Sequence, residues 1–298
     1  MPRARANGIE LEYETFGREG DRPLLMIMGL GAQMLQWDER FCEALAERGH
    51  YAIRFDNRDV GLSTKFDHAG VPDLAALMQP GADRSRVPYT LDDMADDAAG
   101  LIDALGLGSA HVFGASMGGM IAQTVAYRHA AKARSLISLY SSTGNPGLPP
   151  SKPEAMAVLM APRPSDRAGA IDATVRAAQV TSGPGYPIAA DYLRERAARM
   201  YDRAFTPAAA ARHLAAVSAH GNRAPRLAAI TAPTLVIHGT SDPLVPVEGG
   251  RDTAKSIPGA QLVEIEGLGH GIPPALWMRL ADLVAAHTQK AESARSRS

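Results

Sequence analysis

The pentapeptide Gly114-Ala115-Ser116-Met117-Gly118 is the stretch that decides the fold of this 298-residue chain. It follows an apolar segment, Ala110 to Phe113, and precedes a run of small and apolar residues. This order predicts a strand, a tight corner and a helix, and the corner matches the G-x-S-x-G pattern of a nucleophilic serine. So tight a turn forces the serine toward positive φ, and side chains two residues before and after it would collide. Glycine is therefore required at positions 114 and 118.

The same corner has a chemical consequence for Ser116. Its hydroxyl is pushed above the edge of the sheet, in front of a helix N-terminus whose free N–H groups favour a developing negative charge. The bare five-residue pattern also occurs by chance in chains of this length. The predicted strand before it and the predicted helix after it favour the interpretation as a catalytic serine.

Composition and charge exclude several classes of function. Hydrophobic residues make up 46% of the chain, enough for a large core, and the formal net charge is -1 without a long basic run. Nucleic acid or an acidic membrane surface is therefore not expected as the main partner. We see no apolar run long enough to span a bilayer and no signal peptide. The single cysteine, Cys42, cannot form an internal disulfide, which favours a reducing cytoplasm.

Strand-like and helix-like segments alternate along most of the chain, which predicts an α/β fold with a mainly parallel sheet. Period-two alternation or continuous apolar runs predict strands at 9–16, 23–28, 51–56, 110–113, 135–140, 233–239 and 261–265. Helical periodicity and capping residues predict helices at 38–48, 91–105, 117–129, 248–256 and 273–287.

The alternation stops after residue 144. A Gly- and Pro-rich stretch follows, and from about Ser151 to Arg223 we find only helical patterns, rich in Ala, Arg and Met. We therefore expect a helical cap at 145–225, inserted into a core that is formed by residues 1–144 and 226–298.

Two more polar residues follow later strands in loops that contain glycine. Asp242 comes just after the strand at 233–239, and His270 lies in Gly269-His270-Gly271 after the last strand. Because the carboxyl ends of parallel strands meet at one sheet edge, we expect both side chains to lie near Ser116. The chain order Ser, Asp, His is that of a hydrolase triad. In such a triad His270 acts as the base for Ser116, and Asp242 orients the ring and stabilises the imidazolium.

A tetrahedral oxyanion needs two hydrogen-bond donors. The backbone N–H of Met117, directly after the nucleophile, is the first candidate. The turn after the apolar strand at 23–28 supplies the second, where we predict the N–H of Leu30. The loss of one such donor raises a reaction barrier by about 3–4 kcal/mol.

These motifs together resemble the α/β-hydrolase superfamily. The segments that carry the resemblance are Gly114 to Gly119, Gly239 to Pro243 and Gly269-His270, and Phe55 to Ser63 is similar to an Asp-x-Arg-Gly-x-Gly-x-Ser stretch common in that family. The resemblance covers nearly the whole chain, and bacterial esterases of the aclacinomycin-methylesterase type are the most similar group. It implies a mainly parallel, twisted sheet of eight strands flanked by helices, a helical cap after the sixth strand, and no cofactor.

Two positions depart from the pattern of that family. Met28-Gly29 stands at the oxyanion turn where many members have His-Gly, which keeps the backbone donor but removes a histidine brace. Asp59 stands where many relatives have glycine.

The cap and the long connection from Asn57 to Pro88 are expected to shape an apolar pocket. Its candidate walls, each with a packing role as the competing interpretation, are Trp37, Leu148, Met156, Leu159, Met160 and Met200. The His, Asp and Glu residues show no spacing typical of a metal site. Gly29-Leu30-Gly31 lacks the third glycine and the acidic residue of a dinucleotide-binding fingerprint. We therefore expect neither a metal nor a bound dinucleotide, and the resemblance implies no other cofactor.

The leading hypothesis is a serine carboxylic-ester hydrolase that acts on small to medium apolar esters through an acyl-enzyme. Because one fold supports many reactions, a carbon–carbon bond hydrolase and a cofactor-free perhydrolase or haloperoxidase with the same triad are the alternatives. A ligand-binding receptor or carrier is the alternative outside enzymes, and the retained Ser116, Asp242 and His270 argue against it. The expected partner is a small-molecule ester, and the apolar cap residues leave a homodimer open.

Overall fold

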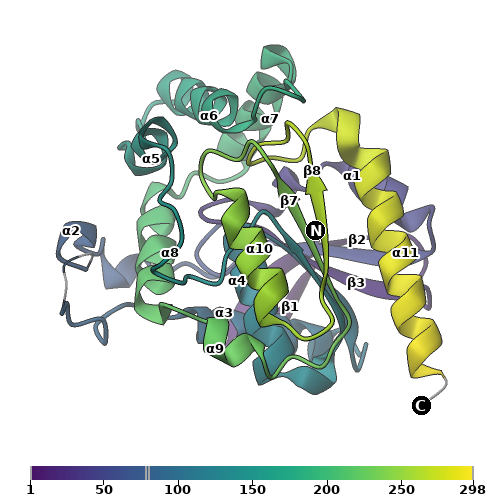
Figure 1. Cartoon of the computed structure of the whole chain (residues 1–298). Helices are drawn as coiled ribbons and strands as arrows, with labels where there is room; N and C mark the ends of the chain where they lie inside the picture. The colour runs from purple at the N-terminus through teal and green to yellow at the C-terminus, as the bar shows by residue number, and fades with distance from the viewer. Residues whose placement is uncertain (1, 78, 80, 297–298) are drawn as a thin grey trace.

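One sheet forms the centre of the protein, and helices cover both of its faces (Figure 1). The computed structural model describes residues 2–77, 79 and 81–296, and within them eight strands pair in the order β1-β2-β4-β3-β5-β6-β7-β8. The strands are β1 (Arg3–Ala6), β2 (Ile9–Phe16), β3 (Arg22–Ile27), β4 (His50–Phe55), β5 (Ala110–Ala115), β6 (Ala133–Leu139), β7 (Thr234–Gly239) and β8 (Gln261–Ile265). β2 pairs antiparallel with β1 and with β4, and the remaining neighbours are parallel. The mainly parallel α/β sheet that the sequence predicts is confirmed.

The helices outside the interval between β6 and β7 follow the alternation expected from the sequence. They are α1 (Glu39–Ala46), α2 (Leu74–Leu77), α3 (Leu91–Ala104), α4 (Met117–Arg128), α10 (Val247–Ser256) and α11 (Trp277–Arg295). Among the described residues, no helix combines the length and the apolar character that crossing a lipid bilayer requires.

Strand β3 shows why an interior strand of this sheet is a continuous apolar run in the sequence. Leu25 and Ile27 belong to the core cluster that also contains residues of α3 and α4. Leu24 and Met26 belong to the cluster on the other face, together with residues of α1 and α11. Because alternate side chains of a strand point to opposite faces, helices on both faces leave all four of these side chains buried.

The two ends of the chain differ from the prediction. The sequence predicts no strand at residues 3–6, yet they pair with β2 and form the edge of the sheet. Helix α11 continues to Arg295 instead of ending at residue 287. Tertiary contacts account for the extra turns, because Ala291 is buried and Glu292 forms an ion pair of 2.9 Å with Arg134.

Between β6 and β7 the described residues form helices and no strand. These helices are α5 (Pro153–Met160), α6 (Arg167–Thr181), α7 (Ala190–Arg203), α8 (Pro207–His220) and α9 (Ala224–Leu227). Figure 1 shows α5, α6 and α7 grouped at the top of the view, with α8 beside the core. We call α5 to α8 the cap helices; the cap boundaries at 145 and 225 stay a prediction.

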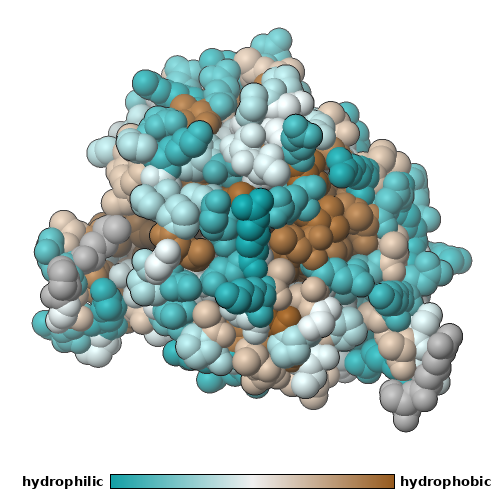
Figure 2. Space-filling view, viewed as in Figure 1, coloured by the Kyte–Doolittle hydropathy of each residue, from teal (hydrophilic) through white to brown (hydrophobic). Residues whose placement is uncertain are grey.

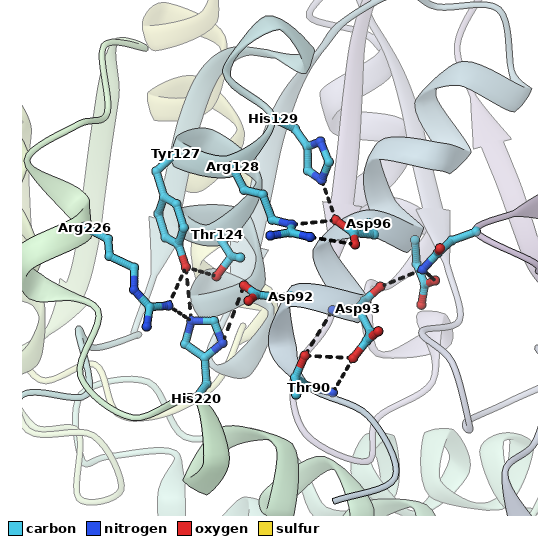
Figure 3. A network of polar contacts seen from close by, with 12 residues as sticks. Thr90, Asp92, Asp93, Asp96, Thr124, Tyr127, Arg128, His129, His220 and Arg226 are labelled. Carbon is cyan, nitrogen blue, oxygen red and sulfur yellow. Dashed lines mark hydrogen bonds and ion pairs between the residues drawn. The ribbon is translucent and has the colours of Figure 1, made fainter. Parts of the chain in front are cut away.

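A polar network ties the end of cap helix α8 to the core helices α3 and α4 (Figure 3). Asp96 of α3 accepts a hydrogen bond of 2.8 Å from Arg128 at the end of α4. The ring of His220, at the end of α8, lies 3.1 Å from the hydroxyl of Tyr127 and 3.8 Å from the carboxylate of Asp92. The last turn of α8 is therefore held against both core helices.

Candidate active site

The corner between β5 and α4 is formed by Ser116 alone. Its backbone has φ 57° and ψ -121°, a conformation that residues with a Cβ rarely adopt. A Cβ on Gly114 would overlap the backbone of Gly118, and a Cβ on Gly118 would overlap the carbonyl oxygen of Ile27. Both glycines are thus required on steric grounds, as the pentapeptide predicts.

Three polar side chains from distant parts of the chain meet at this corner. His270 Nε2 lies 2.8 Å from Ser116 Oγ, and His270 Nδ1 lies 2.7 Å from Asp242 Oδ2. The other carboxylate oxygen of Asp242 accepts the backbone N–H groups of Leu244 at 2.9 Å and Val245 at 2.8 Å. The three residues follow β5, β7 and β8, so the parallel sheet brings their strand ends to one edge. His270 Nε2 is thus close enough to take the proton of the serine hydroxyl, and Asp242 can hold the ring through Nδ1.

The loop that carries His270 is held by the end of cap helix α6. The backbone N–H of Gly269 donates to the carbonyl of Ser182 at 2.9 Å, and the N–H of His270 donates to the carbonyl of Thr181 at 2.7 Å. The histidine is therefore positioned from the cap side as well as from the core.

Tyr140 is a neighbour of the site that the sequence reasoning missed. It follows β6 directly, has φ 36°, and its ring lies 4.5 Å from the His270 ring between centroids. Burial raises the pKa of the Tyr140 hydroxyl, and the charge of Asp242 raises it further, so the phenol stays neutral. Its position at the end of a strand at the same sheet edge is the signal that could have found it.

The turn after β3 lies directly against Ser116. The N–H of Ala32 donates to the carbonyl of Gly29 at 3.3 Å and closes the turn. A Cβ added to Gly29 would lie 3.1 Å from the Cβ of Ser116. Leu30 and Met117 both line the cavity beside Ser116, and no hydrogen bond from the backbone N–H of either to another described residue is observed. Both N–H groups can therefore serve an oxyanion.

A cavity of about 420 Å³ extends from Ser116 and His270 between the core and the cap helices. Most of its wall is apolar, with Met28, Leu30 and Met120 from the core and Leu159, Leu193 and Met200 from the cap. Arg163 and Arg196, which the sequence reasoning did not single out, bring positive charge to the wall. The cavity can hold a ligand of small to medium size with an apolar body.

The structure separates the predicted pocket residues into two groups. Leu159 and Met200 line the cavity, whereas Leu148, Met156 and Met160 do not belong to its lining. The phase of helix α5 explains the result for the methionines. Ala155, Val158 and Leu159 face the cavity at helical spacing, so Met156 and Met160 point elsewhere, and Met160 is 39% exposed.

Trp37 is a further correction, because it packs in the core and does not line the cavity. It is fully buried, its ring lies 4.8 Å from the ring of Phe113, and it stacks on Phe41 at 6.0 Å. The hydrophobic cluster that contains Trp37 packs α1 against the sheet. Trp37 therefore has the packing role that the sequence analysis gave as the competing interpretation.

The described residues contain no group of three or more His, Cys, Asp or Glu side chains that could hold a metal ion. The groups that meet at the site are a serine hydroxyl, an imidazole and a carboxylate.

Comparison with known proteins places this geometry in context. A family described as "alpha/beta hydrolase fold" matches residues 22–273. Rhodomycin D methylesterase DauP of Streptomyces sp. (strain C5) is 31% identical over 95% of this chain and 96% of its own length. The putative carbamate hydrolase RutD of Variovorax paradoxus (strain S110) is 30% identical over 80% of each chain. Among solved structures, the meta-cleavage product hydrolase CumD of Pseudomonas fluorescens IP01 has a TM-score of 0.74 at 19% identity, with 98% of both chains covered.

Proposed function

This chain belongs to the alpha/beta hydrolase fold family, and from that premise we propose that it is a serine carboxylic-ester hydrolase. One observation carries the proposal: Asp242, His270 and Ser116 form an unbroken hydrogen-bonded chain that ends at a strained serine. The similarity to a methylesterase over nearly the full length of both chains supports the same reaction class.

In the proposed reaction Ser116 Oγ attacks the carbonyl carbon of the ester while His270 Nε2 takes its proton. A serine hydroxyl is a weak nucleophile near neutral pH, so it depends on a base at hydrogen-bond distance, which here is 2.8 Å. Asp242 holds Nδ1–H and stabilises the imidazolium that forms. The negative oxygen of the tetrahedral intermediate accepts the N–H groups of Leu30 and Met117.

The second half of the reaction uses the same groups in reverse. His270 returns the proton to the alcohol oxygen as the ester bond breaks, and the acyl group stays on Ser116. Water then attacks this acyl-enzyme with His270 again as base, and His270 returns the proton to Ser116 Oγ as the acid leaves. We propose small to medium apolar esters as substrates because of the cavity size and lining, with methyl esters as the first alcohol group to test.

The proposal is tested by ester hydrolysis with wild-type protein and with Ser116→Ala. We expect the alanine variant to lose at least about 1,000-fold in kcat, because it lacks the hydroxyl that lies at hydrogen-bond distance from His270. Circular dichroism checks that the variant is folded. Mass spectrometry after treatment with an organophosphonate should find the adduct on Ser116 in the wild type. Hydrolysis at the wild-type rate by the alanine variant would contradict the proposal.

The same preparation separates the alternatives. A carbon–carbon bond hydrolase would cleave vinylogous diketones faster than esters of similar size. A perhydrolase or haloperoxidase would show peroxide-dependent turnover in the presence of a carboxylic acid. A receptor or carrier would bind ligands but form no phosphonate adduct.

A further inference from the structure

We propose that His213, on cap helix α8, is a positioning residue that holds the turn carrying the Leu30 N–H. The proposal rests on the proposed function, in which that N–H is an oxyanion donor. It assigns part of the oxyanion machinery to the inserted cap, 182 residues along the chain from the turn.

Both nitrogens of the His213 ring are engaged. The backbone N–H of Gly31 lies 3.0 Å from Nδ1, and the carbonyl oxygen of Arg58 lies 3.0 Å from Nε2. A backbone N–H only donates and a carbonyl only accepts, so Nδ1 must be the bare nitrogen and Nε2 must carry the hydrogen. Burial lowers the pKa of His213 to about 4, outweighing the bond to Arg58, which keeps this neutral form near pH 7. Backbone groups engage both ring nitrogens, so the contribution of the ring is to position the turn.

The bond to Gly31 acts on the middle of the oxyanion turn. Gly31 has φ 64° in the turn that runs from Gly29 to Ala32. The central peptide of such a turn can rotate between two orientations, and φ at its third residue changes sign with it. An acceptor fixed opposite the Gly31 N–H selects one orientation. The Leu30 N–H belongs to the adjacent peptide, so it is held with the turn.

Among the described residues, core side chains form hydrogen bonds with the backbone of this segment at its two ends. Asn57 donates from Nδ2 to the carbonyl of Met28 at 2.8 Å, and the carboxylate of Asp56 accepts the N–H of Met34 at 2.8 Å. Between these two points, the backbone N–H of Gly31 donates to the ring of His213 on α8. A Cβ on Gly31 would lie 2.9 Å from the Cβ of Ala210, so the helix itself also packs on the turn.

Helix α8 is seated firmly enough to act as a support. Arg212, the neighbour of His213, forms a buried ion pair with Asp59, with 2.7 Å between Nη2 and Oδ1. The far end of the helix is held by the contacts of His220 (Figure 3). The ring of His213 is thus placed by contacts on both sides of it along α8.

The test compares two substitutions that each keep one half of the contact. His213→Asn places an amide oxygen near the position of Nδ1 and can still accept the Gly31 N–H. His213→Gln places its amide near the position of Nε2, so it can reach Arg58 but not Gly31. His287→Gln is the matched control, since it replaces a buried histidine of α11 whose Nε2 also lies near a backbone carbonyl, that of Pro233 at 3.2 Å, and which takes no part in seating α8.

We expect His213→Gln to lower kcat for ester hydrolysis by about 10-fold to 100-fold with little change in KM, as for a misplaced oxyanion donor. His213→Asn should restore most of this loss, and His287→Gln should leave kcat near the wild-type value. If His213 were merely structural, kcat would instead fall in both His213 variants, and the loss would be larger in the variant with the lower melting temperature. Equal kcat in the Asn and Gln variants would overturn the proposal.

Amide hydrogen exchange gives a readout that does not depend on activity. The peptide covering residues 29–34 should exchange faster in His213→Gln than in the wild type and in His213→Asn. If the wild type hydrolyses no ester, the proposed function fails, and exchange alone decides the role of His213. Unchanged exchange in His213→Gln would overturn it.

Discussion

At the scale of the residue, Ser116 can keep its strained backbone because Gly114 and Gly118 have no Cβ atom. The serine keeps φ 57° because Gly114 and Gly118 let two backbone segments approach each other and β3 without a Cβ between them. The approach of Gly118 to Ile27 involves β3, but the approach of Gly114 to Gly118 lies within the pentapeptide itself. This is why Ser116 could be identified from a pentapeptide.

Gly118→Ala tests this steric argument directly. The new Cβ would overlap the carbonyl oxygens of Ile27 and Met28, which are backbone atoms and cannot turn away. We expect the free energy of unfolding to fall by about 1–3 kcal/mol, the usual range for overpacking. Urea unfolding of both proteins measures the difference.

Gly271→Ala is the matched control for that measurement. A Cβ there would meet no atom of the described residues within 4 Å, and the residue does not have a positive φ. Its free energy of unfolding should stay within about 0.5 kcal/mol of the wild type. Equal losses in the two variants would show that crowding is not the cause.

At the scale of the element, the ion pair that holds helix α8 on the core explains why residue 59 is Asp and not the glycine of the family pattern. This residue has φ 78°, a region that glycine occupies without strain, and its carboxylate is buried. Burial alone would raise the pKa of Asp59, but hydrogen bonds from Arg212 and Tyr89 lower it overall. The charged carboxylate thus has a structural partner in the cap, which a glycine could not have.

Arg212→Met tests the buried pair. Removal of the guanidinium leaves an uncompensated carboxylate on Asp59, so we expect a loss of about 3–5 kcal/mol in the free energy of unfolding. The double variant with Asp59→Gly should recover part of this loss, because it removes the stranded charge and suits the positive φ. Chemical denaturation of the two single variants and the double variant measures the coupling. Strictly additive losses would mean that the pair does not seat the helix.

At the scale of the whole molecule, buried histidines make the fold sensitive to acid. His50 bonds the carbonyl of Leu45 through Nδ1 at 2.9 Å and lies 2.8 Å from the hydroxyl of Thr288 through Nε2. Burial lowers the pKa of His50 to about 4, outweighing the bond to Leu45, and burial lowers the pKa of His213 to about 4 as well. Both rings are therefore neutral in the folded protein at pH values where the unfolded chain binds a proton.

The sign of the pH dependence follows from that difference. Between the ordinary histidine pKa of about 6.5 and the folded values near 4, the unfolded state holds more protons, so stability falls as the pH is lowered. Each group adds a slope of up to about 1.4 kcal/mol per pH unit in this window. Urea unfolding at pH 7 and pH 5 should reveal the loss. His50→Gln should weaken the pH dependence, and His68→Gln, at an exposed position, should leave it unchanged.

The surface gives a view of the cap and core together. Figure 2 shows hydrophilic side chains over most of the visible face, with hydrophobic areas between them. Most apolar side chains of the strands are absent from this surface because they lie in the interior, between the two layers of helices.

The amino-acid sequence by itself determined the α/β class, the strained corner at Ser116 and the strand ends that carry Asp242 and His270. These features depend on short-range sterics and on the rule that parallel strands end at one edge, so they can be derived without long-range contacts. The antiparallel strand at residues 3–6 escaped prediction because its pairing with β2 is not encoded in its own short pattern.

Only the tertiary structure decided which side chains line the cavity and what supports the turn after β3. Leu159 faces the cavity and Met156 does not, because the phase of α5 is set by packing against other elements. The contact between His213 and Gly31 joins residues far apart in the chain. No local pattern specifies such a meeting, because it depends on how the inserted helices dock on the sheet edge where Ser116 lies.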